Sequence, residues 1–233
     1  MTFPSFPKKP FERIRNNHLD ALNQMSDHAS AVAGRALNLG LLNGTVKSRP
    51  SDGLREDLSR LTIADLEKHL DLLFRTDRMH VLVIGGKKSS EIAAKVVNFV
   101  DSLPCKACGR PDLQLKTRLY SKWTINPRKI VVIDRPGITE AHVQMGFLAP
   151  PRKNPEFYEL RLAETILSGY FASRMNMIIR EKLSLTYGIS AGFDFDDDLG
   201  FFTVATSTRN QKVGELMHAL DKLLADFVQE GAS

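Results

Sequence analysis

Two strand-like runs joined by an acidic turn constrain the fold of this chain more than any other feature. "YGISAGFDFD" (187–196) and "GFFTVATST" (200–208) meet around "DDDLG", a pattern typical of an antiparallel hairpin. A helical pattern follows, with an apolar face made of Val213, Leu216, Met217, Leu220, Leu224, Phe227 and Val228. Helices combined with antiparallel strand pairs predict an α+β fold, in which a mostly antiparallel sheet carries helices on one face.

The residues before the hairpin show the same mixture of patterns. "KIVVID" (129–134) is typical of a strand, and "EAHVQMGFLAP" (140–150) alternates like one. "NPEFYELRLAETILSG" (154–169) predicts a helix that Asn154 caps, with Pro155 in its first position and Gly169 at its end. "SRMNMIIREKL" (173–183) is expected to continue helically.

The first half of the chain reads as a helix–strand–helix series. Residues 11–34 predict one or two helices, and Thr62 is a good N-cap for a helix with a stripe at Ile63, Leu66, Leu70 and Leu73. "MHVLVIGG" (79–86) is a short β-branched run typical of a buried strand, and "SSEIAAKVVNFVDSL" (89–103) predicts a helix. We therefore divide the chain into a segment 1–104, a Pro- and Cys-containing linker 105–128, and a segment 129–233.

Charge and composition exclude few function classes. The net charge of +5 is mild, and basic residues are not interleaved with aromatic ones, so we expect no nucleic-acid partner. No apolar run is long enough to predict membrane insertion, and the first residues lack the apolar core of a signal peptide. These patterns predict a soluble chain, cytoplasmic or periplasmic if it is bacterial.

The two cysteines form one C-x-x-C, at Cys105 and Cys108. Such a pair can be half of a zinc site or a redox pair. A structural zinc site needs four ligands, and neither a second C-x-x-C nor an H-x-x-x-H supplies the other two. We therefore expect incidental thiols and no metal in this chain, while a redox or metal role stays an alternative.

Other candidate sites have simpler interpretations. A Walker phosphate loop around "VIGGKKSSE" (83–91) would need glycine at position 81, where Val81 stands, so a plain strand–turn–helix is favoured. The aspartates at 194, 196, 197 and 198 lack EF-hand spacing, and a solvated hairpin tip is favoured over a cation site. No two of the six histidines are three or four residues apart, so the chain has no H-x-x-E-H zinc motif.

Arg180 and Tyr187 are the remaining candidates. They flank the change from a helical to a strand pattern, and both side chains are hydrogen-bond donors. Donors of these types suit a peptide carbonyl or a developing oxyanion. The alternative is an ordinary helix residue beside Glu181 and an ordinary strand aromatic.

The stretch "AETILSGYFASRMNMIIREKLSLTYGISAGF…GFFTVATSTR" resembles the non-catalytic domain of the pitrilysin/insulinase (inverzincin) metallopeptidases. In that family a small-residue stretch precedes a helix ending in Arg-Glu-Lys, and Leu-x-Tyr, a hairpin and a Thr-rich strand follow. Residues 58–104 and 11–37 are similar to further family segments, so the likeness covers most of the chain. Ser184 and Thr186 depart mildly, because the family often has Gly and Ala there.

The resemblance implies a fold, a function and a partner. The fold is the layered metallopeptidase half found in LuxS and processing peptidase. Arg180 and Tyr187 would bind peptide substrate beside a zinc ion that an H-x-x-E-H-bearing partner domain or subunit carries. The chain alone would then hold no catalytic residue, no metal and no cofactor, and would cut no peptide bond. A catalytically inactive scaffold, or a peptide-binding subunit of a complex, is the alternative.

The order of the segments adds a second implication of the resemblance. In the family, a helix–strand–helix like residues 11–104 closes a domain, and a series like residues 129–233 opens one. The chain would then be the middle of a longer protein, or its two parts pack as one permuted domain. Exchange between chains in a homodimer is a further expectation.

Overall fold

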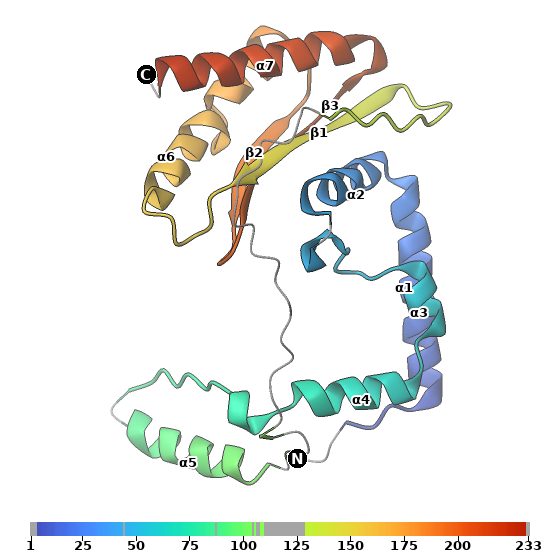
Figure 1. The fold of residues 1–233 in the computed structure, drawn as a ribbon, viewed down its shortest axis with the longest axis vertical. Coiled ribbons are helices and arrows are strands. Elements are labelled where there is room, and N and C mark those ends of the chain that lie inside the picture. The colour runs from blue at the N-terminus through green and yellow to red at the C-terminus, as the bar shows by residue number, and fades with distance from the viewer. Residues whose placement is uncertain are drawn as a thin grey trace. The chain divides into compact units, whose positions relative to one another are not determined.

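The computed structural model describes residues 4–43, 45–86, 88–103, 105, 108–109 and 129–231. Figure 1 shows the helices α1 (Lys8–Asp27), α2 (Ala29–Leu42), α3 (Arg55–Arg60), α4 (Ile63–Leu73), α5 (Ser89–Asp101), α6 (Phe157–Ser168) and α7 (Val213–Glu230). The strands are β1 (Glu140–Ala149), β2 (Ile189–Phe195) and β3 (Gly200–Arg209). A π-helix spans Asn176–Lys182, and 3-10 turns span Val46–Ser48, Thr76–Arg78 and Asn210–Lys212. The chain is therefore α+β, as its sequence predicts.

The chain divides into two compact units. Unit 1 comprises Met1–Leu22 and Gly53–Lys116, and unit 2 comprises Asn23–Asp52 and Thr117–Ser233. The proposed linker 105–128 lies mostly outside the described residues. The division of the chain at 104 and 128 stays a prediction.

The sheet of unit 2 has the order β1-β3-β2, and both pairs are antiparallel. β2 and β3 form the predicted hairpin, with Phe195 opposite Gly200 at its tip. Even-numbered β3 residues such as Phe202 and Val204 are buried, because successive side chains of a strand point to opposite faces. This side chain alternation gives the sheet one face for the main core.

The main core lies between that face and the helices around it. It joins β3 to Leu167 of α6, to Met175 and Ile179 in and beside the π-helix, and to the apolar face of α7. Leu216 and Leu220 of α7 have no exposed surface. The core thus uses most of the apolar stripe predicted for the last helix, but Val228 is 83% exposed and Leu223, outside the predicted stripe, is buried.

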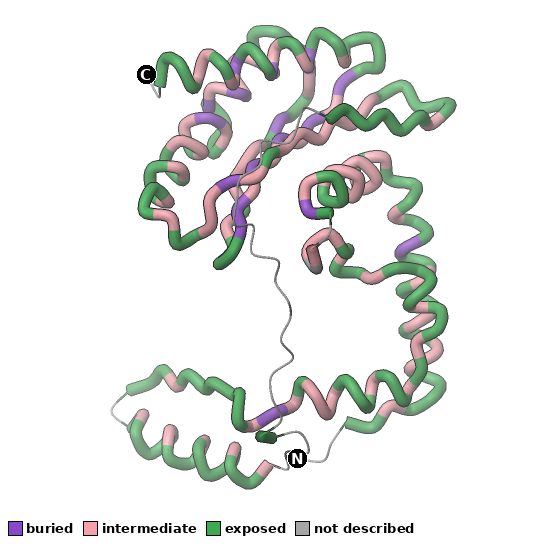
Figure 2. The backbone as a smooth tube through the Cα atoms, viewed as in Figure 1, coloured by how far each residue is buried: buried purple, intermediate pink, exposed green. Residues whose placement is uncertain are grey.

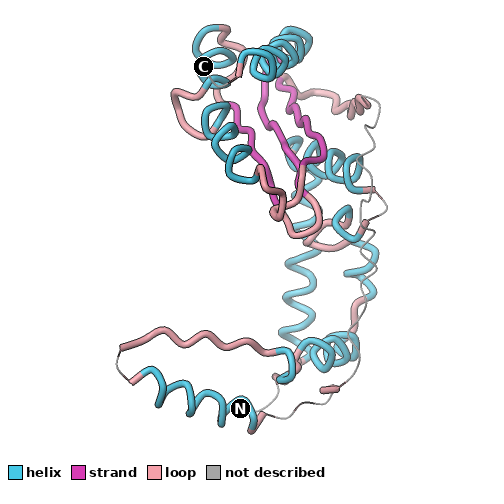
Figure 3. The backbone as a smooth tube through the Cα atoms, turned by 60° about the vertical axis from the view of Figure 1, so that its left-hand side comes forward, coloured by secondary structure: helices cyan, strands magenta, loops and turns pink. Residues whose placement is uncertain are grey.

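The opposite face of the sheet is covered as well, contrary to the expectation of helices on one face. Gly146 of β1 lies opposite Thr203, on the face turned away from Phe202 and Val204. A Cβ at Gly146 would come within 3.1 Å of Leu41 of α2, so α2 packs there. Figures 1 and 3 show α2 on the side of the sheet away from α6 and α7. The prediction failed because the α2 segment is distant from the sheet in sequence.

Two predicted strands are wrong. Residues 79–86 and 129–134 take part in no strand ladder in the described part of the chain. Their apolar side chains are largely exposed, with Ile84 at 87% and Val132 at 84%. A strand forms only where a neighbouring strand accepts its backbone hydrogen bonds. An apolar, β-branched run indicates that a segment could be buried in a sheet, but it does not show that such a neighbour exists.

Two helix boundaries differ from prediction in detail. α6 begins at Phe157 and not at Pro155, because the Asn154 side chain accepts from the backbone N–H of Glu156 and forms a turn ahead of the helix. Gly169 ends α6 as expected. The segment before the hairpin is helical as predicted but takes the wider π form.

Unit 1 contains little buried surface, as Figure 2 shows. Among its described residues, only Leu22 and Arg75 are buried, and α4 and α5 bury no residue. The N-terminus of α4 nevertheless follows the sequence prediction. Thr62 and Asp65 form a reciprocal capping box, in which each side chain accepts from the other residue's backbone N–H.

In the part of the chain that the structure describes, no helix is both long and apolar enough to cross a membrane.

Candidate functional site

The connection between the π-helix and β2 carries both predicted site residues. The π-helix ends with long-span backbone bonds, from Leu183 N–H to the Ile178 carbonyl and from Leu185 N–H to the Ile179 carbonyl, each 3.0 Å. Ser184 takes a φ of 51°, in the left-handed region that few non-glycine residues adopt. The turn at Ser184 therefore ends the helix abruptly and sends the chain into the sheet.

The residues after this turn are fixed by threonines of β3. The buried Thr208 hydroxyl donates to the Leu185 carbonyl at 2.6 Å. The Thr206 hydroxyl lies 2.9 Å from both the Thr186 hydroxyl and the Gly188 carbonyl. These contacts explain the threonines on the buried face of β3: their hydroxyls satisfy carbonyls of a segment that is not part of the sheet.

Tyr187 projects outward from this fixed segment. It is 91% exposed, although Leu185 is only 4% exposed. The sequence places Tyr187 at a strand start, and the structure places it two residues before β2. Its backbone is held by its neighbours while its phenol is open to solvent.

Arg180 lies near the end of the π-helix and is half-buried. Its guanidinium lies over the ring of Phe171, 4.7 Å from the centroid. Its Nε is 3.4 Å from Oε1 of Glu181, the neighbour that the alternative interpretation named. A guanidinium has five N–H donors, so these contacts orient the group without using all of them.

An open hollow of unit 2 lies elsewhere. It is lined by Asp27, His28, Ala29, Ser30, 137–140 and His142, with a cavity volume of about 490 Å³. Arg180 and Tyr187 are not among its lining residues. The prediction that the two side chains face one cavity stays a prediction.

The acidic turn between β2 and β3 is a solvent-exposed tip. Asp194, Asp196, Asp197 and Asp198 are all exposed. Asp196 forms an ion pair with Lys47, and the bond from Lys47, then the Asp197 backbone N–H, hold the pKa of the Asp196 carboxyl below its usual value. These contacts give the Asp196 carboxylate a structural role that needs no bound cation.

The glycine- and lysine-containing stretch "VIGGKKSSE" (83–91) leads into α5, which begins at Ser89; Lys87 lies outside the described residues.

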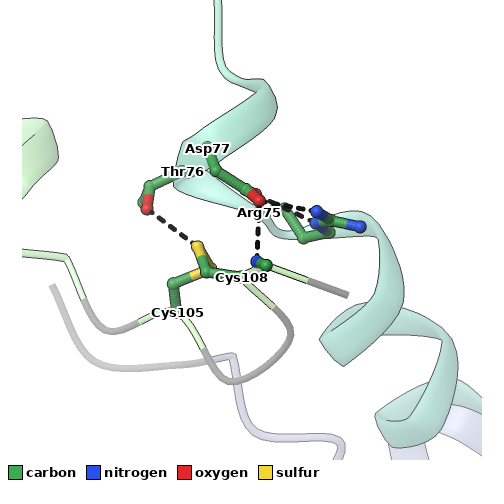
Figure 4. Close-up of polar contacts among 6 residues, drawn as sticks. Arg75, Thr76, Asp77, Cys105 and Cys108 are labelled. Carbon is green, nitrogen blue, oxygen red and sulfur yellow. Dashed lines mark hydrogen bonds and ion pairs between the residues drawn. A yellow bond between two sulfur atoms is a disulfide. The ribbon is translucent and has the colours of Figure 1, made fainter. Parts of the chain in front are cut away.

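The expectation of incidental thiols is wrong, because Cys105 and Cys108 form a disulfide. Cys108 and Gly109 lie beside the turn after α4, where Asp77 accepts from the Gly109 backbone N–H at 2.9 Å (Figure 4). The bonds from Arg75, then the one from Gly109, hold the pKa of the Asp77 carboxyl well below its usual range. Sequence reasoning missed Asp77, since Cys105 lies 28 positions further along the chain and no motif joins them.

The fold and the sequence together define a class of protein. The chain has the helix-covered antiparallel sheet of a metallopeptidase half, and its sequence lacks H-x-x-E-H. The sequence profile of the family described as "Peptidase M16 inactive domain" matches residues 60–233. The chain belongs to this family.

Sequence relatives are similar over almost all of this chain. "Non-peptidase homolog YmxG" of Helicobacter pylori is 21% identical over 232 residues, which cover 98% of this chain and 51% of the relative. "Uncharacterized zinc protease YmxG" of Bacillus subtilis is 19% identical over 231 residues, covering 97% and 53%. The chain spans about half the length of these curated relatives.

Solved structures show the same fold. The M16 inactive domain of Pseudomonas fluorescens matches with a TM-score of 0.73 at 19% identity, over 97% of this chain and 53% of that one. A protease of Helicobacter pylori matches with a TM-score of 0.72 at 17% identity, over 97% and 59%. The periplasmic protease PqqL of Escherichia coli matches with a TM-score of 0.68 at 14% identity, over 98% and 24%.

Proposed function

We propose that this chain supplies Arg180 and Tyr187 as a peptide-binding pair beside a zinc site carried by a partner domain or subunit. The observation that carries the proposal is the exposed phenol of Tyr187 on a rigid backbone. Leu185 is buried and Gly188 is hydrogen-bonded, so the segment is held firmly. A phenol that is 91% exposed adds little to the core, and its fixed position suits recognition of a ligand.

Arg180 fits the same role. Stacking on Phe171 restricts the guanidinium and so reduces the entropy lost when a ligand binds. The pair would donate to the carbonyl oxygen of a peptide, and more strongly as that oxygen gains negative charge. Zinc in the partner would supply an activated water. The part of this chain is to hold the peptide and stabilise the developing oxyanion.

Exposed apolar side chains in unit 1 support the proposal that the chain binds a partner. α4 and α5 are amphipathic but bury no residue. Leu73 is 68% exposed, and Leu82 in the unpaired run is 84% exposed. Apolar surface left in water on this scale marks an interaction site. The curated relatives, about twice as long as the matched region, are consistent with completion by further polypeptide, by an H-x-x-E-H-bearing subunit, or by a second copy in a homodimer.

The test combines the purified chain with its H-x-x-E-H partner and measures peptide hydrolysis. Arg180→Ala and Tyr187→Phe should each lower kcat by about a hundredfold, because each removes a donor to the oxyanion. Arg152→Ala and Tyr158→Phe are matched controls. Arg152 also stacks on a phenylalanine, 5.1 Å from the Phe157 centroid, and Tyr158 is 79% exposed. Unchanged activity in both site variants would overturn the proposal.

A second candidate is an inactive scaffold or a peptide-binding subunit without hydrolysis. The name of the Helicobacter pylori relative, a non-peptidase homologue, favours it. Peptide binding that depends on Arg180 and Tyr187 without cleavage would select the peptide-binding subunit. Assembly with the partner that neither substitution affects would select the scaffold.

A further inference from the structure

The disulfide between Cys105 and Cys108 in unit 1 lies beside the turn that follows α4. Figure 4 shows the disulfide beside the side chains of Thr76 and Asp77, with one sulfur in contact with Thr76. The Thr76 hydroxyl is 3.4 Å from Sγ of Cys108, and the Gly109 backbone N–H donates to Asp77. Side chains from two distant stretches of the chain thus form one cluster.

The Asp77 carboxylate of this cluster is held in place by hydrogen bonds from Arg75. Nε of Arg75 donates to Oδ1 of Asp77 at 2.9 Å, and its terminal nitrogen donates to Oδ2 at 2.6 Å. Arg75 is only 8% exposed, so it is a fixed support. A carboxylate oxygen and the two sulfurs all lie within 4.8 Å of one another. Oδ2 accepts from both Arg75 and the Gly109 backbone N–H, whereas Oδ1 accepts only from Arg75 among these bonds, so Oδ1 keeps an acceptor site for a further ligand.

The disulfide itself gives little structural benefit. Its sequence separation is three residues, so it restricts the unfolded chain much less than a long-range bridge would. Cys108 is exposed and Cys105 partly so, which leaves the bond open to attack by a thiolate. The position beside a fixed carboxylate is therefore the feature to explain.

We propose that reduction converts this cluster into a binding site for a thiophilic divalent cation such as Zn²⁺, with Cys105, Cys108 and Asp77 as its ligands. A dithiol reductant breaks the sulfur–sulfur bond by exchange, gives up two electrons and becomes a cyclic disulfide. The two released sulfurs carry the two protons of the dithiol as thiols. The cation then displaces those protons and binds both thiolates. Exchange with an oxidised dithiol, which takes up the two electrons, re-forms the protein disulfide, removes both thiolate ligands and releases the cation.

The geometry suits zinc. Zn–S bonds of about 2.3 Å and Zn–O bonds of about 2.0–2.2 Å place tetrahedral ligands roughly 3.5–3.8 Å apart. The present separations, all within 4.8 Å, reach this range once the sulfurs part. Arg75 and Gly109 would act as outer partners that orient the carboxylate. Three protein ligands leave the fourth position to water.

The first test compares the reduced and the disulfide forms of the full 233-residue chain. After reduction with a phosphine and its removal under anaerobic conditions, Co²⁺ is added as a spectroscopic probe. Thiolate-to-cobalt charge-transfer absorption and strong visible bands should appear in the reduced form only. Competition with a chromogenic chelator should show about one tightly held Zn²⁺ per reduced chain. Equal binding by both forms would overturn the proposal, and this comparison needs no variant.

The second test asks whether Asp77 is a ligand. Asp77→Asn should weaken Zn²⁺ binding to the reduced chain by about tenfold or more, because it removes an anionic oxygen ligand. Cys105→Ser should abolish the thiolate–cobalt spectrum of a two-sulfur site. Asp101→Asn is the matched control, since Asp101 is exposed at the end of α5 and should leave affinity unchanged. Full affinity in folded Asp77→Asn, with circular dichroism unchanged, would refute the site. Neither test depends on peptidase activity, so its outcome is separate from that of Arg180 and Tyr187.

Discussion

Replacing Thr208 by valine tests the frame that holds the candidate site. The Thr208 hydroxyl is the donor to the Leu185 carbonyl at 2.6 Å, and both residues are buried. Valine has nearly the same shape, so the substitution removes a hydrogen bond without opening a cavity. A buried acceptor left without its donor costs about 1–3 kcal/mol. We expect the free energy of unfolding of unit 2 to fall by that amount.

The assay is denaturant and thermal unfolding, followed by circular dichroism. Each kcal/mol should lower the thermal midpoint by about 2–4 °C for a unit of this size. Thr165→Val is the matched control, because the exposed Thr165 hydroxyl bonds back to Arg161 within its own helix. The control should change stability by less than about 0.5 kcal/mol. A Thr208→Val variant as stable as the control would refute the argument that this hydroxyl anchors the site segment.

Two further predictions concern packing and pH. Gly146→Ala should destabilise unit 2 by about 1–3 kcal/mol, because the new Cβ would lie 2.8 Å from the Phe202 carbonyl oxygen. The control is Gly214→Ala, whose Cβ would have no atom within 4 Å. It should be neutral or stabilising in the same unfolding assay. The Thr62 hydroxyl, then its backbone N–H, lower the pKa of Asp65, so ionised Asp65 stabilises the start of α4 above its unfolded pKa, and this contribution is lost as the pH falls through the folded value. Protection of the first-turn amides from hydrogen exchange should therefore exceed that of Asp65→Asn at about pH 6 and match it at about pH 2; an equal gap at both pH values would contradict the assignment.

Local features of the fold were predictable because they depend on neighbours in sequence. The hairpin from β2 to β3 and the Thr62 cap appear as predicted, and so does most of the apolar face of α7, with Leu223 buried and Val228 exposed. The predicted strands at 79–86 and 129–134 failed, because a ladder requires a partner that no local pattern reveals.

For the candidate site, too, local features could be predicted from the sequence and long-range contacts could not. Arg180 and Tyr187 could be selected from their donor chemistry and from the family resemblance. The threonine contacts that fix the backbone beside Tyr187 could not, since Thr206 and Thr208 lie about twenty residues further along the chain. Asp77 was missed for the same reason: its approach to the cysteines depends on where the turn after α4 lies.

The sequence by itself determined the α+β class, the helix stripes, the hairpin and the absence of a zinc-binding motif of the H-x-x-E-H type. Each of these can be predicted from the spacing of residues within one segment. Only the tertiary structure decided that α2 covers the second face of the sheet, that β3 threonines support the Tyr187 segment, and that Asp77 lies beside the disulfide. These contacts join distant segments, and the packing of the whole unit selects them.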